Sequence, residues 1–234
     1  MAEPAVAHQV YNDVLAELLP VLKCKAGHED HRLRVVAVDV KNRRLDHFCN
    51  YTAPGAYFVE IQNLPEPVLT YLLPSRYCES DKFGDLAREI TAWSLPGYDQ
   101  VASIDRWVRN TIRYTPGSSN YPISAVEVHA RREGVCRDLA HLGIALCRSI
   151  SIPTRLVVGY LDGLYPMDLH AWFEAYVGSR WYTFDPTQNE ICGGRVAIAY
   201  GRDAADVSVF HQFGPGAILT SMEVRVERLE YAPD

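Results

Sequence analysis

The sequence predicts an α+β fold, in which helices come first along the chain and an antiparallel sheet follows. Apolar residues recur at helical spacing in several segments between residues 82 and 150. Residues 152–187 instead have strand patterns, with a buried strand in "IPTRLVVGYL" and two strands around Gly178 and Ser179. The chain has 234 residues, of which 48% are hydrophobic and 22% are charged, so it can bury a full hydrophobic core.

The N-terminal part combines helical and strand-like patterns. Residues 6–22 predict a helix because apolar side chains recur every four positions, although Pro20 ends or kinks it. The pattern from 33 to 61 is strand-like, with "RLRVVAVDV" alternating and "AYFVEIQ" following a Pro-Gly turn. We expect residues 1–62 to form an N-terminal helix plus a small β-rich region.

The Pro-rich break "NLPEPV" at residues 63–68 separates this region from the main domain, which we assign to residues 63–234. Periodicity predicts helices over 82–93, 100–112, 124–131 and 136–150. The remaining strands are expected in "IPTRLVVGYL", in a hairpin within "LHAWFEAYVGSRWYTFDPT", in "GGRVAIAYGRDAADV" and in "SMEVRVERLE".

Charge and hydropathy exclude several partner classes. The formal net charge is -6 and the Lys and Arg residues are scattered, which argues against a nucleic-acid partner. No apolar run approaches the roughly 18 residues of a membrane span. The first residues carry Glu3, Asp13 and Glu17 rather than a basic start and an apolar stretch. We therefore expect a cytoplasmic protein without a membrane partner.

The six cysteines include no CxxC pair, so zinc-ribbon and thioredoxin-like sites have no support. The chain is not small and its cysteines are not clustered, and we expect most of them to be reduced. A metal site at Cys136, His141 and His170 has no supporting spacing. The sequence thus predicts no metal and no other cofactor.

Cys136 differs from the other cysteines because it follows Gly134 and opens a predicted helix. We expect Gly134 to provide a sharp turn, which places Cys136 in the first helical turn. Free backbone N–H groups and the helix dipole favour a thiolate there, and the same N–H groups can hold an oxyanion. The alternative is a buried, inert cysteine, which suits Cys147 in mid-helix better.

A cysteine nucleophile needs a base, and His170 is the strongest candidate. It opens a strand whose alternation places His170, Trp172, Glu174 and Tyr176 on one face. His141, five positions beyond Cys136, points well away from the thiol on a helix.

The hairpin "VGSR" fixes the partner of this histidine. Glycine at the first central position predicts a two-residue type II′ turn, which pairs Val177 with Arg180. The same register places Trp172 opposite Asp185 and leaves His170 one diagonal step away on the same face. A His–Asp pair follows, in which the carboxylate orients the ring. The alternative is that Asp185 is a turn residue in "DPT".

Three ordered motifs, "GVCRDLAHLGIALCRSISIPTRLVVGY", "MDLHAWFEAYVGSRWYTFDPT" and "GRDAADV", resemble the bacterial transglutaminase-like superfamily, whose members are often described as candidate cysteine proteases. The resemblance runs from about Tyr71 to the last strand. It implies a papain-like core in which a helix bearing the cysteine packs on an antiparallel sheet bearing the histidine and the aspartate. The family's catalytic residues fall on Cys136, His170 and Asp185.

Other candidates for the site come from the same resemblance. Arg137 stands where animal transglutaminases have a tryptophan, and the chain lacks their calcium-site and barrel regions. The resemblance therefore supports thiol chemistry better than protein cross-linking. Relatives place an oxyanion donor in the loop that holds Tyr114, Asn120 and Tyr121, and the sequence does not choose among these three. Trp172 is expected to shield the ion pair or to line the acyl pocket.

Two flanking motifs, "SRYCESD" and "GRDAADV", could border the cleft, but we favour capping and salt bridging. Asp81 would then cap the next helix, and Arg202 would pair with Asp203 or Asp206.

The predicted activity is thiol-dependent acyl transfer on a peptide, protein or glutamine-type amide through a thioester. Hydrolysis is favoured slightly over transamidation to an amine acceptor, because nothing in the sequence shows how a water-excluding amine site would be built. The alternative is a catalytically silent module that binds a peptide or protein on the same fold. Substrate identity and oligomeric state are not encoded in these patterns.

Overall fold

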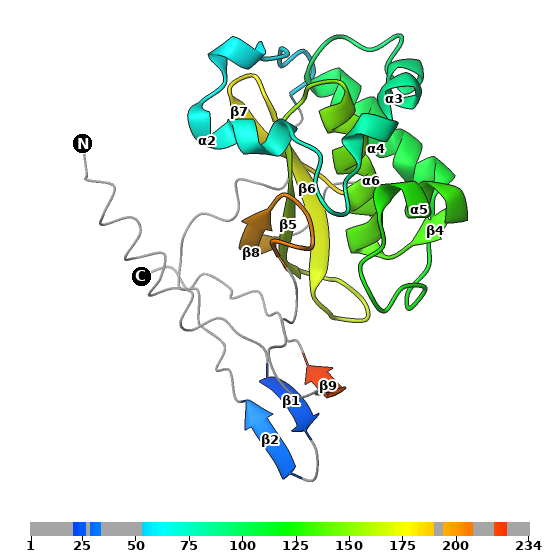
Figure 1. Ribbon diagram of the computed structural model, residues 1–234, viewed down its shortest axis with the longest axis vertical. Coiled ribbons are helices and arrows are strands. Elements are labelled where there is room, and N and C mark those ends of the chain that lie inside the picture. Colours follow the sequence, from blue (N-terminus) through cyan, green and yellow to red (C-terminus); the bar gives the residue numbers. More distant parts are fainter. Residues whose placement is uncertain (1–20, 27–28, 34–52, 190–193, 208–217, 224–234) are drawn as a thin grey trace, which may run out of the picture.

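The computed structural model describes residues 21–26, 29–33, 53–189, 194–207 and 218–223. The α+β architecture predicted above is confirmed: helices pack on an antiparallel sheet. Figure 1 shows α6 (Cys136–Ser149) against one side of the sheet, with most of the other helices on that side. No helix among the described residues is both long and apolar enough to cross a membrane.

The other helices are α2 (Glu66–Leu69), α3 (Gly84–Ile90), α4 (Tyr98–Thr111) and α5 (Ala125–Arg131). Short 3-10 turns cover η2 (Ile61–Asn63), η3 (Thr70–Leu72) and η4 (Ser80–Lys82). The main sheet has the order β7 (Arg180–Phe184), β6 (His170–Val177), β5 (Thr154–Leu161) and β8 (Arg195–Gly201). A parallel pair joins β3 (Arg113–Tyr114) to β4 (Glu133–Gly134), and a third sheet contains β1 (Val21–Ala26), β2 (Glu29–Leu33) and β9 (Ile218–Glu223).

Helix α6 is the centre of the core. Every residue from Asp138 to Arg148 is buried, because other elements cover this helix on all sides. It packs on β6 at Gly143, where an added Cβ would lie 2.6 Å from Cε1 of Phe173. This close approach sets the distance between the helix that starts at Cys136 and the strand that starts at His170.

Replacing Gly143 by alanine is therefore expected to lower the free energy of unfolding by about 1–3 kcal/mol through overpacking. Gly84→Ala is the matched control, because its added Cβ would meet only the Arg88 guanidinium, at an ordinary 3.4 Å. That control should stay within about 1 kcal/mol of the wild type. Urea denaturation measures both changes, and equal stabilities for the two variants would contradict the packing argument.

The N-terminal predictions are partly wrong. Within the predicted helix 6–22, residues 6–20 lie outside the described residues, but Val21 and Leu22 open strand β1. Strand β1 pairs with β2 on one side and β9 on the other, so ladder hydrogen bonds override the helical spacing of these two residues. The last predicted strand is seen as β9, and residues 224–230 lie outside the described residues.

The strand predicted up to residue 61 is also wrong where it can be seen. Residues 34–52 lie outside the described residues, and in 53–61 a single bridge joins Tyr57 to Gly97. The backbone of this segment is hydrogen-bonded to a loop instead of to a strand: the N–H of Gly178 donates to the Tyr57 carbonyl at 2.8 Å. Alternating apolar residues form a strand only where a neighbouring strand is available. Residues 53–58 pack on the main core, and the boundary at residue 63 stays a prediction.

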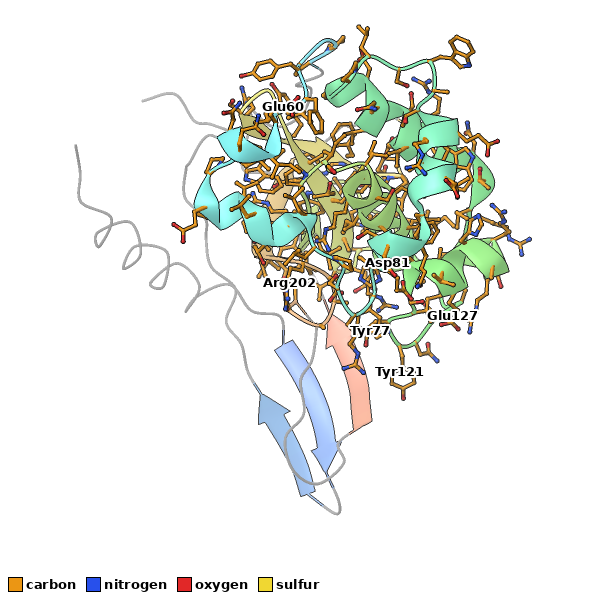
Figure 2. The ribbon with its side chains drawn as sticks, turned by 45° about the horizontal axis from the view of Figure 1, so that its top comes forward. Glu60, Tyr77, Asp81, Tyr121, Glu127 and Arg202 are labelled. Atoms are coloured by element: carbon orange, nitrogen blue, oxygen red, sulfur yellow. The ribbon has the colours of Figure 1, made fainter. Side chains whose placement is uncertain are left out.

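The two flanking motifs meet around Arg148, which is 3% exposed. Its guanidinium donates to the carbonyls of Leu73, Thr154 and Arg202, at 2.7–3.0 Å, and to Ser75 Oγ at 3.1 Å. One buried cation therefore joins "SRYCESD", the start of β5 and "GRDAADV". Tyr77 and Arg202, which lie on one side of the molecule in Figure 2, come from these two motifs.

We expected salt bridging and helix capping from these two motifs; the salt bridge is confirmed and the cap is wrong. Arg202 pairs with Asp206, its Nε donating to Oδ2 at 2.8 Å. Asp81 does not cap the next helix: it pairs with Lys82 inside η4, and the residue before α3 is Phe83. The chain forms a 3-10 turn first, so α3 starts too late for Asp81 to reach its N–H groups.

Candidate active site

Cys136 lies at the first position of α6 as a partly exposed free thiol. Two features hold the turn before it. Asp138 Oδ2 accepts the N–H of Val135 at 3.1 Å, and the Val135 carbonyl accepts the N–H groups of Asp138 and Leu139. The side chain is thus placed at the helix N-terminus, as predicted from the sequence.

Gly134 does not form the predicted sharp turn. It lies in strand β4, in register with Tyr114 of β3, and the left-handed residue is Arg132 at the end of α5, with φ 60°. Glycine is needed at 134 for a different reason, because an added Cβ would lie 2.8 Å from Cβ of Asp138. Close approach, rather than backbone conformation, selects the glycine.

The predicted hairpin register is confirmed. Val177 pairs with Arg180, and the ladder continues to Phe173 opposite Phe184. The turn is of type I′ rather than II′, because Gly178 (φ 54°) and Ser179 (φ 63°) are both left-handed. Both turn types have two central residues, so the parity of the ladder is the same and the expected His–Asp contact is kept.

His170 Nε2 lies 2.8 Å from Asp185 Oδ2, and both side chains are almost completely buried. Arg195 Nη2 donates to the same oxygen at 3.1 Å. The other carboxylate oxygen accepts from Thr187, through N at 3.1 Å and through Oγ1 at 2.7 Å. Burial alone would raise the pKa of Asp185, but the His170 hydrogen bond and charge and the Arg195 charge hold it below its usual value.

Through its bonds to Thr187, Asp185 also takes part in the "DPT" turn. It is therefore both the partner of His170 and a turn residue.

His170 joins this carboxylate to the thiol. Burial by itself lowers the pKa of the ring, but hydrogen bonds to Asp185 and Cys136, and their charges, raise it to about 10. Because Nε2 contacts Asp185, Nδ1 is the nitrogen available to Cys136. The geometry thus brings Cys136, His170 and Asp185 together in one line of contacts, and favours the charged form of the His170 ring.

Trp172 is buried, with 1% of its surface exposed, and stacks beside His170 with ring centroids 6.1 Å apart. It therefore covers the His–Asp pair, which is the first of the two roles expected for it. Such a cover excludes water and strengthens the electrostatic interactions beneath it.

The remaining candidates divide into two groups. Arg137 donates to Ser119 Oγ, to the Tyr121 carbonyl and to Asp138 Oδ1, each at 3.0 Å, so it holds the 115–124 loop. The Tyr121 side chain is 80% exposed and extends away from the body in Figure 2. Asn120 of the same loop is also exposed.

Tyr114 borders the thiol. Burial raises its pKa, and the charges of Cys136, Asp168 and Asp185 add to that effect. It is 44% exposed, so its phenol faces both the site and the solvent. Of the three loop candidates, Tyr114 is the one placed beside the reacting groups.

His141 and Cys147 lie away from the reacting groups, as predicted. His141 Nε2 accepts the N–H of Ala204 at 3.2 Å, so the proton of its neutral ring is on Nδ1, which faces the Ile123 carbonyl at 3.1 Å. Burial lowers the pKa of His141 to about 4 and raises that of Cys147 to about 12. Both groups are inert parts of the core.

Sequence reasoning missed Arg195, Thr187 and the Asp138–Ser119 hydrogen bond. Thr187 could have been found, because a hydroxyl two residues after an aspartate commonly accompanies a turn. Arg195 lies ten residues beyond Asp185, across the sheet, and nothing in the spacing indicates the contact. Among the described residues, no group of three His, Cys, Asp or Glu side chains could hold a metal ion.

Comparison with known proteins agrees with this geometry. Residues 84–186, from α3 to the end of the hairpin, match the sequence profile of the transglutaminase-like superfamily. A candidate cysteine protease from Cytophaga hutchinsonii has a crystal structure that is 45% identical in sequence to this chain, with a TM-score of 0.69, covering 73% of this chain and 58% of that one.

Two mycobacterial relatives are uncharacterized proteins. The one from Mycobacterium leprae is 34% identical over 136 residues, which are 54% of this chain and 48% of the relative. The one from Mycobacterium tuberculosis is 33% identical over 142 residues, which are 53% of this chain and 45% of the relative. The matches thus span about half the length of these relatives. Residues 84–186, which contain Cys136, His170 and Asp185, thus form a transglutaminase-like domain.

Proposed function

We propose that this protein is a thiol-dependent acyl-transfer enzyme that acts on amide bonds of a peptide or protein, or on a glutamine-type amide. The observation that carries the proposal is the position of His170, which is buried and contacts Cys136 on one side and Asp185 on the other. An imidazolium held in this way keeps a thiolate beside it, and a thiolate is the nucleophilic form of cysteine.

The proposed reaction has two steps. The Cys136 thiolate attacks the amide carbonyl carbon, and the carbonyl electrons move to the oxygen. When the C–N bond breaks, His170 gives its proton to the leaving amine, and a thioester remains on Cys136. Water or a second amine then attacks the thioester, gives a proton to His170 and releases the acid or the new amide.

Developing charge on the carbonyl oxygen needs hydrogen-bond donors. The first N–H groups of an α-helix have no acceptor within the helix. Those of Asp138 and Leu139 already donate to the Val135 carbonyl, so the N–H groups of Cys136 and Arg137 are the ones suited to this role. The Tyr114 phenol is the side-chain donor that we propose beside them, since it borders Cys136 and is partly exposed. Arg137 is already engaged with the 115–124 loop, and we give it a structural role.

Hydrolysis is the expected direction. Cys136 and Tyr114 are both partly exposed, so water can reach a thioester formed there. The description of the Cytophaga hutchinsonii protein as a candidate cysteine protease supports the same choice. Release of ammonia or of a peptide amine from test substrates, with and without an added primary amine, measures the balance between hydrolysis and transamidation.

Brief, substoichiometric iodoacetamide at pH 6 should label Cys136 ahead of the other cysteines. Cys78 and Cys147 are internal controls, because burial raises the pKa of each thiol far above 6. His170 keeps its proton up to about pH 10, so the labelling rate should be nearly flat from pH 7 to 9. An ordinary thiol would instead become about tenfold more reactive per pH unit below its pKa.

Mass spectrometry of tryptic peptides, with Cys136→Ala as the blank, locates the label. Slow and uniform labelling of several cysteines would count against the enzyme and leave a peptide-binding module on the same fold.

A further inference from the structure

Arg195 is the first residue of β8, next to β5 at the edge of the sheet, yet its guanidinium reaches Asp185 beyond β7. It passes the Trp172 ring, with its Cζ 5.8 Å from the ring centroid. Gly159, opposite His170, makes room for the Trp172 ring and for the backbone of Val196. An added Cβ there would lie 2.8 Å from Cη2 of Trp172 and 2.0 Å from the Val196 carbonyl oxygen.

Packing alone does not account for an arginine at this position. The side chain is 4% exposed, and its Nε and Nη1 are buried without a hydrogen-bond partner within the described part of the chain. Burying a cation with so few partners is unfavourable, and an apolar residue of similar volume would often cost less. What the arginine adds is its contact with Asp185.

That contact fixes the carboxylate. Oδ2 receives His170 Nε2 at 2.8 Å and Arg195 Nη2 at 3.1 Å, while Thr187 occupies Oδ1. With donors on both oxygens the carboxylate cannot rotate away from the ring. Since His170 and Arg195 share one oxygen atom, their two nitrogens are at most about 6 Å apart, where two charges in a protein still interact strongly.

The four groups alternate in charge when the thiolate forms: Cys136 negative, His170 positive, Asp185 negative and Arg195 positive. The buried row is then neutral. Without Arg195 the row carries one negative charge, and each proton on the Cys136–His170 pair would be held more tightly. Formation of the thiolate and loss of the imidazolium proton would both move to higher pH.

We propose that Arg195 is a positioning residue of this site, which holds Asp185 against His170 and lowers the pH at which the Cys136 thiolate forms beside the protonated His170 ring. This inference rests on the proposed function, because it assigns a role to a contact of the same site. It adds a cation to the cysteine, histidine and aspartate that the sequence predicts.

Other charged groups face the same row and must be kept constant in a test. They are Asp105 and Arg109 on α4, Tyr114 on β3, and Asp168 between β5 and β6. Arg109 pairs with Asp105 and donates to the Asp185 backbone carbonyl at 3.5 Å. Burial raises the pKa of Asp105 to about 7, so its charge changes in the relevant range. It is present in every Arg195 variant, so comparison at equal pH removes its contribution.

The test is the pH profile of Cys136 alkylation by iodoacetamide from pH 4 to 10, measured on the full chain by mass spectrometry. Arg195→Met and Arg195→Gln remove the charge, and Arg195→Lys keeps it. We expect the lower midpoint of the profile to rise by about one pH unit in the neutral variants, with a rate about tenfold lower below it. Arg195→Lys should move the midpoint by less than half as much. Circular dichroism checks that each variant is folded.

Three results would overturn the proposal. Midpoints equal to the wild type in Arg195→Met and Arg195→Gln would refute the role of Arg195 and leave the proposed function intact. A rate lowered at every pH, with an unchanged midpoint, would make Arg195 a structural residue only. A wild-type profile like that of an ordinary thiol would refute the proposed function and this inference together. If Arg195→Met does not fold, Arg195→Gln gives the same comparison, because glutamine can still donate to Asp185.

Discussion

His170→Ala should slow the alkylation of Cys136 at pH 6 by about 10²-fold, because an unassisted thiol is less than about 1% ionised at that pH. In the native protein the ring holds a positive charge beside the sulfur, with its pKa raised to about 10. Removal of the ring takes away that charge and also the proton donor for the leaving amine. Turnover of any amide substrate should then fall by about 10²–10⁴-fold.

His129→Ala is the matched control for this variant. His129 lies on α5, where its ring packs against Phe83 and Trp107 rather than against the reacting groups. Labelling rates for both variants come from the same mass-spectrometric assay, and thermal melts check that both are folded. Equal rates in His170→Ala and the wild type would show that His170 does not activate the thiol.

Arg148→Met is expected to lower the free energy of unfolding by about 3–5 kcal/mol. The guanidinium satisfies the carbonyls of Leu73, Thr154 and Arg202 in a buried position. Methionine fills much of the volume but donates no hydrogen bond, so the buried Thr154 carbonyl and the partly buried carbonyls of Leu73 and Arg202 would lose this donor. Chemical denaturation followed by fluorescence measures the change.

Arg202→Met is the matched control, since it removes an arginine that is 46% exposed and pairs with Asp206 at the surface. An exposed ion pair contributes about 0–1 kcal/mol, so this variant should be nearly as stable as the wild type. Similar losses in the two variants would mean that Arg148 does not hold the two motifs together. Arg148 lies near the end of α6, far along the helix from Cys136. Comparisons of Arg148→Met with the wild type should be made at temperatures where the variant is still folded.

The reacting groups could be predicted because each depends on local rules. A cysteine at the start of a helix is visible as a break in periodicity, and Cys136 is found there. The His170–Asp185 contact follows from the number of residues in a hairpin turn, which fixes strand parity whichever turn type forms. That is why the wrong turn type did not disturb the predicted contact.

Other predictions failed where partners distant in sequence decide the structure. Val21 and Leu22 have helical spacing but lie in β1, because β2 and β9 supply ladder partners on both sides. "AYFVEIQ" alternates like a strand, but its backbone is hydrogen-bonded to loop residues instead of to a neighbouring strand. Gly134 was expected to form a turn, and it is instead a point of close approach to Asp138.

The sequence by itself determined the helix that starts at the cysteine, the hairpin that pairs the histidine with the aspartate, and the α+β order of the core. Only the tertiary structure decided which cation meets Asp185 and which of Tyr114, Asn120 and Tyr121 borders the thiol. The physical reason is the range of the interactions. Helical periodicity and hairpin register act over a few residues, whereas burial brings Arg195 from a separate strand to Asp185 and removes the water that would otherwise screen their charges.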